Sequence, residues 1–440
     1  MHYDLIVIGM GLSGLMAAKT AAAAGQKVLI LGKGMGSLCL FSNTIDVLGE
    51  SPTAMNPVRN SAGTSNSAGT ILGPNPVAEQ PATISKGVKM AEALSEWIEG
   101  HPLHPYSKVG VKNLEEALSS FLSLFLPPYS FQAIDNRNCL LPTGAGTLRP
   151  TYLIPVTMAE GISGKEGHAL IVGFKGFKDF YAHYVADQLR CRGINLELTD
   201  LLNQELTVTA LARLMEKKSF RENIGREIKK QLRGETRVGL PAVLGTHDPA
   251  QVKDDLEAIT SAKVFEIPIL PPSIPGMRIF NCLKEWLIRK GVSFLLGHSV
   301  SKAVLRGKRC ERIEVLHPPV IISYSADRYI LATGRFIGGG LKANDEKVIE
   351  PIFNLPLSQP PSRKDWFEDS FFGNFPHPIH GAGILTDASF RPVDAGGDII
   401  LENVWAAGSI LAHHHCVDEK SREGIEISTG YVAASRALGV

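Results

Sequence analysis

The chain has 440 residues, with 45 basic and 44 acidic side chains and a formal net charge of +1. This length predicts two or three domains, and 44% apolar with 20% charged residues is typical of a globular protein with a large core. The balanced charge gives no electrostatic reason to expect nucleic-acid binding, and no apolar run reaches the ~20 residues that span a bilayer. We therefore expect a cytoplasmic protein that does not bind nucleic acid.

The N-terminal residues carry the strongest local pattern. A buried strand over residues 5–8 leads directly into the turn Gly9-Met10-Gly11-Leu12-Ser13-Gly14, an Ala-rich helix follows to residue 24, and residues 28–31 form a second strand. This β-α-β unit is the context in which a G-x-G-x-x-G turn binds a nucleotide. We expect this turn to bind a cofactor phosphate through the residues Gly9, Gly11, Ser13 and Gly14.

The end of the second strand departs from the dinucleotide pattern. The position that usually carries Asp or Glu for the ribose hydroxyls holds Gly32, followed by Lys33. A glycine offers no side-chain acceptor, whereas the Lys33 ammonium suits a phosphate. The sequence therefore favours FMN, or a weakly held FAD, over NAD.

Two segments follow this unit before the next helix. Residues 34–49 contain small polar side chains, among them Ser42, and either pass beside the cofactor or form an ordinary loop. Residues 50–80 are rich in Pro, Ser, Asn and Gly and contain NSAGT twice, which is typical of a disordered surface insertion. We expect a flexible insertion over residues 51–85.

Two arginines in the middle of the chain are candidates for binding an anion. Arg149 stands beside a second Gly-rich turn within residues 142–155. Arg278 follows a Pro-rich loop at the start of a helix that runs to about residue 290, where backbone and side chain both donate hydrogen bonds. The alternative for Arg278 is an exposed side chain with no partner.

Two later strands also end in glycine. Residues 328–334 end with Thr333-Gly334, and residues 403–409 end with Gly408-Ser409. Together with the N-terminal turn, three buried strands end in this way. A doubly wound sheet that binds a cofactor at its strand ends would produce this pattern, so we expect Thr333, Gly334, Gly408 and Ser409 in the cofactor site.

The run His413-His414-His415 follows the last of these turns. Adjacent side chains point in different directions, so the three do not readily bind one metal ion, and we expect no metal site. One of them, for which we take His413, is a candidate acid, base or hydrogen-bond donor. The six cysteines show no C-x-x-C pair, and therefore no recognisable iron–sulfur cluster motif.

Several longer segments resemble the B subunit of anaerobic glycerol-3-phosphate dehydrogenase. They are HPYS at 104–107, GTLRPTYL at 146–153, LPPSIPGMRI at 270–279, ATGRFIGGGL at 332–341 and AAGSI at 406–410. The resemblance covers most of the chain outside residues 50–80. The family tends to have a Gly/Cys-rich turn before its last helix, and this chain has Lys420-Ser421-Arg422-Glu423-Gly424 there instead.

The resemblance implies a Rossmann-like α/β flavoprotein fold and a role in oxidising sn-glycerol 3-phosphate to dihydroxyacetone phosphate. Electrons would pass towards quinone through an FAD-containing A subunit, this FMN-type chain and an iron–sulfur C subunit that anchors the complex to the cytoplasmic membrane. Residues 1–50 and 320–440 would form a discontinuous flavin-binding domain, and residues 86–319 an inserted α/β domain presenting Arg149 and Arg278 to the cleft. The alternatives are a stand-alone flavin dehydrogenase of another hydroxy compound, and a flavin-free structural subunit that kept the fold.

Overall fold

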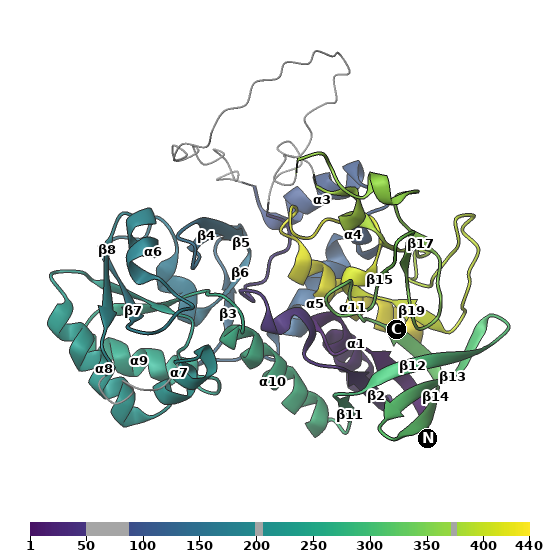
Figure 1. Ribbon diagram of the computed structural model, residues 1–440, viewed down its shortest axis with the longest axis horizontal. Coiled ribbons are helices and arrows are strands. Elements are labelled where there is room, and N and C mark those ends of the chain that lie inside the picture. Colours follow the sequence, from purple (N-terminus) through teal and green to yellow (C-terminus); the bar gives the residue numbers. More distant parts are fainter. Residues whose placement is uncertain (50–87, 199–205, 371–375) are drawn as a thin grey trace, which may run out of the picture.

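The computed structural model describes residues 1–49, 88–198, 206–370 and 376–440. The flexible insertion predicted at residues 51–85 lies outside the described residues. Figure 1 shows two bodies side by side, with both chain termini on the larger one.

The larger body contains a seven-stranded sheet with the N-terminal strand in its interior. Its hydrogen-bonded order is β11 (Ser293–Leu296), β2 (Val28–Gly32), β1 (His2–Ile8), β14 (Val320–Leu331), β13 (Arg309–His317) and β12 (Ser299–Arg306), and β19 (Val404–Ala406) also pairs with β14. Strands β11, β2, β1, β14 and β19 run parallel, and β12, β13 and β14 form an antiparallel meander. Val7 of β1 lies opposite Ile30 and Ile330, so this apolar run is buried as a central parallel strand should be.

Helices from both ends of the chain pack together on this sheet. α1 (Leu12–Ala23) packs against α11 (Arg422–Leu438) and α10 (Ile274–Arg289), and α11 in turn packs against α4 (Pro105–Val109) and α5 (Val111–Leu122). α1 and α11 approach so closely that a Cβ on Gly430 would lie 2.3 Å from the Ser13 carbonyl oxygen. The small residues of α1 permit this approach, and it fixes the two ends of the chain against each other.

The smaller body is a second parallel α/β unit. Its sheet has the order β10 (Lys263–Ile267), β9 (Arg237–Pro241), β7 (Ala169–Phe174) and β8 (Arg192–Leu196). Its helices are α6 (Ala182–Gln188), α7 (Val208–Met215), α8 (Lys218–Gln231) and α9 (Pro249–Thr260). In Figure 1 it lies to the left, and α10 lies between the two bodies.

Shorter elements complete the described chain. Two-stranded pairs are β3 (Phe131–Ala133) with β6 (Leu153–Pro155), β4 (Cys139–Pro142) with β5 (Leu148–Thr151), β15 (Lys342–Ala343) with β16 (Val348–Ile349), and β17 (Leu357–Ser358) with β18 (Gly383–Ile384). The remaining helix is α3 (Met90–Gly100), and 3-10 turns are η1 (Gly36–Cys39), η2 (Val156–Gly161), η4 (Arg363–Asp365), η5 (Pro378–Gly381) and η6 (Gly408–Ile410).

The packing divides the chain differently from the boundary predicted at residues 86 and 319. Leu94 of α3 and Phe121 of α5 belong to the hydrophobic core of the larger body, and β11 to β13 extend its sheet. A separate core is built from residues between Leu170 and Ile274. We therefore propose that the inserted domain comprises about residues 134–274, because α4 and α5 pack against α11 and α3 packs against α4 and α5.

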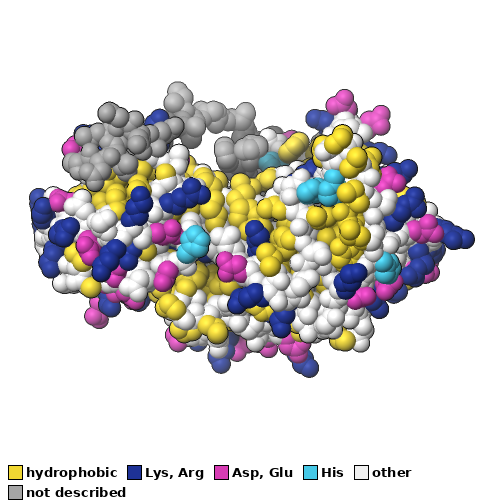
Figure 2. All heavy atoms as spheres, turned by 90° about the horizontal axis from the view of Figure 1, so that it is seen from below, with side chains coloured by type: hydrophobic (Ala, Val, Ile, Leu, Met, Phe, Trp, Pro, Cys, Tyr) yellow, Lys and Arg dark blue, Asp and Glu magenta, His cyan; other side chains and the backbone are white. Residues whose placement is uncertain are grey.

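The surface carries charges of both signs. Figure 2 shows basic and acidic side chains interspersed on one face, with hydrophobic patches between them. Within the described residues, no helix is both long and apolar enough to span a bilayer.

Candidate functional site

The turn between β1 and α1 combines two tightly packed glycines with an open one. A Cβ on Gly9 would lie 2.1 Å from the Ala332 carbonyl oxygen, and one on Gly14 would lie 2.0 Å from the Gly9 carbonyl oxygen. Gly9 also has φ = +124°, which disfavours other residues. A Cβ on Gly11, in contrast, would meet no atom within 4 Å. Gly9 and Gly14 hold the turn together, while Gly11 faces open space before the helix.

The N-terminus of α1 has unused hydrogen-bonding capacity. No side chain caps the helix, so its first N–H groups carry the partial positive charge of a free N-terminus. Ser13 in the first turn is only 4% exposed, and within the described residues its hydroxyl has no hydrogen-bond partner. These donors and the space over Gly11 fit a cofactor phosphate.

The two later glycine turns come together with the first. β14 and β19 are neighbours in the sheet, so Thr333-Gly334 and Gly408-Ser409 follow strands that end at the same edge. A Cβ on Gly408 would lie 2.7 Å from the Ser13 Cβ, and one on Gly334 would lie 3.6 Å from the Ser409 Oγ. The Thr333 hydroxyl is buried without a hydrogen-bond partner. The predicted cofactor residues of three distant segments therefore share one edge of the sheet.

The strand end at Gly32 has no room for a large acidic side chain in its present packing. A Cβ there would lie 3.0 Å from the Met10 amide nitrogen, and the Gly32 carbonyl accepts hydrogen bonds from Gly297 and His298. Lys33 is exposed, and its Nζ lies 3.4 Å from where a Cβ of Gly339 would be. Lys33 thus points towards the glycine-rich segment that follows β14.

The three glycine turns at the sheet edge, at residues 9–14, 333–334 and 408–409, together form what we call the cofactor cradle. The segment after β2 connects this cradle to the second body. A Cβ on Gly36 would lie 2.7 Å from the Gly11 Cα, so η1 rests directly on the turn at residues 9–14. The Asn43 amide donates hydrogen bonds to the Leu38 carbonyl at 2.8 Å and to Ser273, the N-cap of α10, at 3.0 Å. A cofactor that extends from Gly11 along this segment would reach the boundary between the bodies.

A cavity of about 360 Å³ lies at that boundary. Its lining residues come from both bodies and are Leu40, Phe41, Ser42, Thr44, Leu141, Pro142, Thr143, Gly144, Ala145, Arg149, Thr151, Asp179, Tyr181, Pro268, Ile269, Leu270 and Pro271. Two of the predicted site residues, Ser42 and Arg149, line it, whereas Arg278 and His413 do not.

Arg149 is held by a buried carboxylate. Its Nη2 forms an ion pair with Asp46, whose side chain is 1% exposed, and its Nη1 donates to the Ser42 Oγ at 3.3 Å. Thr44 donates a second hydrogen bond to Asp46 at 3.2 Å. Burial by itself would lower the pKa of Arg149. The negative charges of Asp46 and Glu423 outweigh this effect, so the pKa of Arg149 is raised. Arg149 therefore stays charged at the cavity wall.

The first turns of α11 place further carboxyl groups near Asp46. Arg422 forms an ion pair with Glu423, and its guanidinium lies 3.4 Å from the centre of the Phe41 ring. Glu426 accepts a hydrogen bond from Ser37 at 3.3 Å. Burial raises the pKa of both Glu423 and Glu426. These charged groups lie on the first turns of the helix because α11 begins at Arg422.

Arg278 has an internal role in place of the expected ligand contact. Its Nη1 and Nη2 donate to the two Glu266 carboxylate oxygens at 2.7 and 2.8 Å, and its Nε donates to the Gly245 carbonyl at 2.8 Å. Both side chains are almost completely buried. This bidentate pair connects α10 with β10, and each of its three nitrogens already has an acceptor within the chain.

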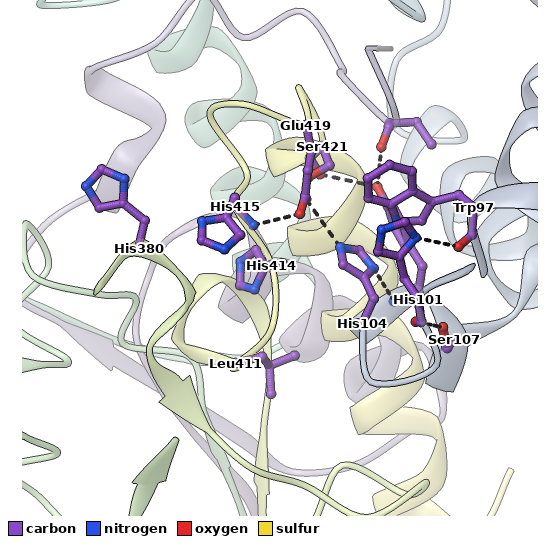
Figure 3. A network of polar contacts seen from close by, with 12 residues as sticks. Trp97, His101, His104, Ser107, His380, Leu411, His414, His415, Glu419 and Ser421 are labelled. Atoms are coloured by element: carbon purple, nitrogen blue, oxygen red, sulfur yellow. Dashed lines mark hydrogen bonds and ion pairs between the residues drawn. The ribbon is translucent and has the colours of Figure 1, made fainter. Parts of the chain in front are cut away.

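His414 and His415 of the histidine run lie in a separate polar network, shown in Figure 3. His413 has φ = +64°, and its amide donates to the Gly381 carbonyl at 3.0 Å. Burial, with a smaller effect of the charge on Lys108, lowers the pKa of His413. The buried His414 accepts a hydrogen bond on Nδ1 from Arg335 at 3.2 Å. The described residues contain no group of three or more His, Cys, Asp or Glu side chains suited to a metal ion.

Glu419 is the centre of this network. It accepts hydrogen bonds from His104 Nε2 at 3.2 Å, from Ser421 at 2.6 Å and from the His415 amide at 2.7 Å. Because His104 Nδ1 accepts the Tyr106 amide, its proton is on Nε2. Burial alone would raise the pKa of Glu419, but these partners outweigh it and lower the pKa to about 2. The network fixes the segment that leads into α11 against α4.

Sequence reasoning missed the roles of Asp46, Glu419, Glu423 and Glu426. In the sequence, Asp46 resembles the other small polar residues of its loop, and the three glutamates belong to charged stretches that resemble solvent-exposed ones. The segment HPYS at 104–107 is a usable signal, since it contains His104 and Tyr106.

The comparisons with known proteins agree with this geometry. The profile of a family described as "FAD binding domain" matches residues 4–424. A Halobacterium salinarum protein, named as the probable B subunit of an anaerobic glycerol-3-phosphate dehydrogenase, is 31% identical over 451 residues, with 99% of this chain and 97% of the relative covered. The Vibrio cholerae protein named as the B subunit of that enzyme is 30% identical over 460 residues, with coverage of 100% and 97%.

This chain belongs to the B-subunit family of anaerobic glycerol-3-phosphate dehydrogenases. The resemblance and the α/β flavoprotein fold predicted from the sequence are confirmed, and the family places the chain among flavin-dependent oxidoreductases. A 3-ketosteroid Δ1-dehydrogenase structure from Sterolibacterium denitrificans matches with 100% of both chains covered, at 11% identity and a TM-score of 0.42. The matched profile is an FAD family, so the comparisons give no support to FMN over FAD, and that preference stays a prediction.

Proposed function

We propose that the chain is the flavin-binding B subunit of an enzyme complex that oxidises sn-glycerol 3-phosphate to dihydroxyacetone phosphate. The observation that carries the proposal is the cradle at the sheet edge. It has open space at Gly11, an uncapped helix N-terminus and two buried hydroxyls, on Ser13 and Thr333, without partners. Buried polar groups without partners are rare in proteins, and a bound flavin phosphate would satisfy them. The names of full-length relatives supply the substrate.

The chain's own residues would position the cofactor and keep water from it. The α1 N-terminus and Ser13 would hold the phosphate, and the Thr333 and Gly408 turns would hold the adjoining part of the cofactor. A bound flavin supplies a two-electron acceptor that releases electrons one at a time. The buried carboxyls on the first turns of α11 would set the charge at the far end of the site.

We also propose the partner subunits, the electron acceptor, the membrane association and the cofactor that the family resemblance and the sequence imply. An A subunit with FAD and a C subunit with iron–sulfur clusters would be the partners, and quinone the later acceptor of electrons. Association with the cytoplasmic membrane would come through those partners. FMN is the finer proposal for the cofactor, because Gly32 lacks an acceptor for ribose and Lys33 offers a cation for phosphate.

The test is the absorbance spectrum of the purified chain, followed by heat release and mass analysis of the cofactor. Stoichiometric flavin supports the proposal, and its mass decides between FMN and FAD. The co-expressed complex should then bleach its flavin absorbance when sn-glycerol 3-phosphate is added without oxygen. A folded chain with no flavin, alone or in the complex, would refute the proposal and favour a structural role.

A further inference from the structure

The cavity at the boundary of the two bodies has features that the cofactor cradle does not use. Its walls are mostly apolar, with Pro142, Pro268 and Leu270 among them, and its polar groups are few. A volume of about 360 Å³ is at the lower end of the range for small-molecule sites. Both bodies contribute to the lining, as is common for sites at domain boundaries.

Arg149 has hydrogen-bonding capacity left after its internal contacts. A guanidinium carries five N–H donors, and two of them are used, on Asp46 and on Ser42. Its Nε is buried and has no hydrogen-bond partner in the part of the chain that the structure describes. Because the side chain is 29% exposed and stays charged, it offers an incoming anion a donor fork of the kind that binds phosphate or carboxylate.

A second, independent group in the same lining also lacks a partner. Thr151 is 2% exposed, and its hydroxyl makes no hydrogen bond to any described residue. Leaving a buried hydroxyl unpaired destabilises the protein unless something satisfies it. Thr151 follows Arg149 by two residues on β5, so both belong to the same short strand.

The charges around the cavity suit a ligand that combines an anion with hydroxyl groups. Among the described lining residues Arg149 is the one cation, and Arg422 adds a second guanidinium behind the lining residue Phe41. Asp179, from the smaller body, is the one carboxylate among the described residues of the lining. It would repel a bare anion but accept hydrogen bonds from hydroxyls. Ser42 and Thr44 add hydroxyls from the larger body.

We propose that this cavity binds a small phosphate monoester of a polyol, with Arg149 contacting the phosphate and with Thr151, Ser42 and Asp179 as further polar contacts. The inference rests on the proposed function, since it names the place where this chain would bind the substrate. Arg149 would thus be a binding residue, and Asp46 would act through it as a positioning residue.

The experiment is calorimetric titration of the purified full chain with sn-glycerol 3-phosphate, and separately with glycerol and inorganic phosphate. Arg149→Gln should weaken binding of the phosphate ester at least 30-fold, and Arg149→Lys should fall between it and wild type, because it keeps the charge and loses the fork. Glycerol should show no measurable binding, and inorganic phosphate should bind more weakly than the ester. The matched control is Arg192→Gln, which also breaks an ion pair of an arginine with a side chain 27% exposed, and should leave binding unchanged.

A second variant keeps the test decisive if Arg149→Gln does not fold. Thr151→Val is nearly isosteric and removes a hydroxyl that has no internal bond, so it should weaken binding 3- to 10-fold without lowering the melting temperature. Unchanged binding in a folded Arg149→Gln or in Thr151→Val would overturn the proposal, as would an equal loss in Arg192→Gln.

Flavin content, measured on the same samples, separates this inference from the proposed function. A flavin-free chain that binds the ester through Arg149 would refute the flavin role and support the cavity. If the chain contains flavin but Arg149→Gln binds the ester as tightly as wild type, the cavity proposal is refuted and the proposed function is not.

Discussion

Gly11→Val should remove flavin binding and leave the fold intact. Gly11 has φ = −72° and ψ = 178°, an extended conformation that any residue adopts, and its Cβ would meet no atom within 4 Å. The substitution therefore adds neither strain nor a clash to the empty protein. Its branched side chain would occupy the space in which the phosphate meets the α1 N-terminus.

The expected loss is larger than that of one hydrogen bond. Removing a single bond to a charged group costs about 1.5–3 kcal/mol, and a side chain at Gly11 would displace the phosphate from several N–H groups and from Ser13 together. We expect at least about 3 kcal/mol, which is roughly a 100-fold weaker Kd. Gly11→Ala should cause a smaller loss, because a single methyl group fills less of the space.

The assay is flavin per chain, with thermal unfolding of the flavin-free protein as the folding control. Gly14→Ala provides the contrast, since its Cβ would lie 2.0 Å from the Gly9 carbonyl oxygen, and it should lower the melting temperature. Gly100→Val tests a valine at another open position, at the end of α3, and should keep its flavin. A Gly11→Val protein that retains full flavin would refute the assignment of the phosphate to this turn.

Three further predictions concern buried charges. Glu266→Gln leaves Arg278 buried without its counter-ion and should lower the free energy of unfolding by about 3–5 kcal/mol, whereas replacing both residues with Met should cost less; denaturant titration measures both. Burial raises the pKa of Glu426 above its unfolded value, so its contribution to stability is greatest below about pH 4.5 and is lost as pH rises through the folded pKa. Glu426→Gln should therefore raise the melting temperature at pH 8 and lose this advantage at pH 4, and an equal effect at both pH values would contradict the assignment. The pKa of Glu419 is lowered from 4.5 to about 2, so its carboxylate contributes about 3 kcal/mol to the free energy of unfolding above pH 4.5, and this contribution is lost as pH falls towards 2. The difference in free energy of unfolding between wild type and Glu419→Gln should therefore become smaller as pH falls from 4.5 to 2, as measured by unfolding at a series of pH values.

The meeting of the glycine turns at one sheet edge could be predicted from the sequence because the signals are local, and the role of these turns in cofactor binding stays a prediction. Gly9, Gly11 and Gly14 follow an apolar strand within a few residues. The same pattern, a buried strand that ends in a glycine turn, occurs again at Gly334 and Gly408. Parallel pairing then brings these strand ends together without further information.

The partners of charged side chains could not be predicted in the same way. Arg278 resembles an anion-binding residue at a helix start, but β10 places Glu266 beside it. His104 and Glu419 are separated by 315 residues and meet only because α4 packs on α11. The domain boundary is hard to predict for the same reason, since the amphipathic pattern of helices 90–122 shows that one face is buried and does not show against which body.

The position of β1 determines the order in which the protein can fold during synthesis. β1 is translated before the other strands of its sheet, and one of its two neighbours there is β14, whose last residue is Leu331. At ribosomal rates of ~5–20 residues per second, the first strand waits roughly 15–65 s for that partner. The smaller body, whose core lies between Leu170 and Ile274, is complete earlier. A nascent chain can therefore carry a finished α/β unit while the apolar edge of β1 that pairs with β14 is still open.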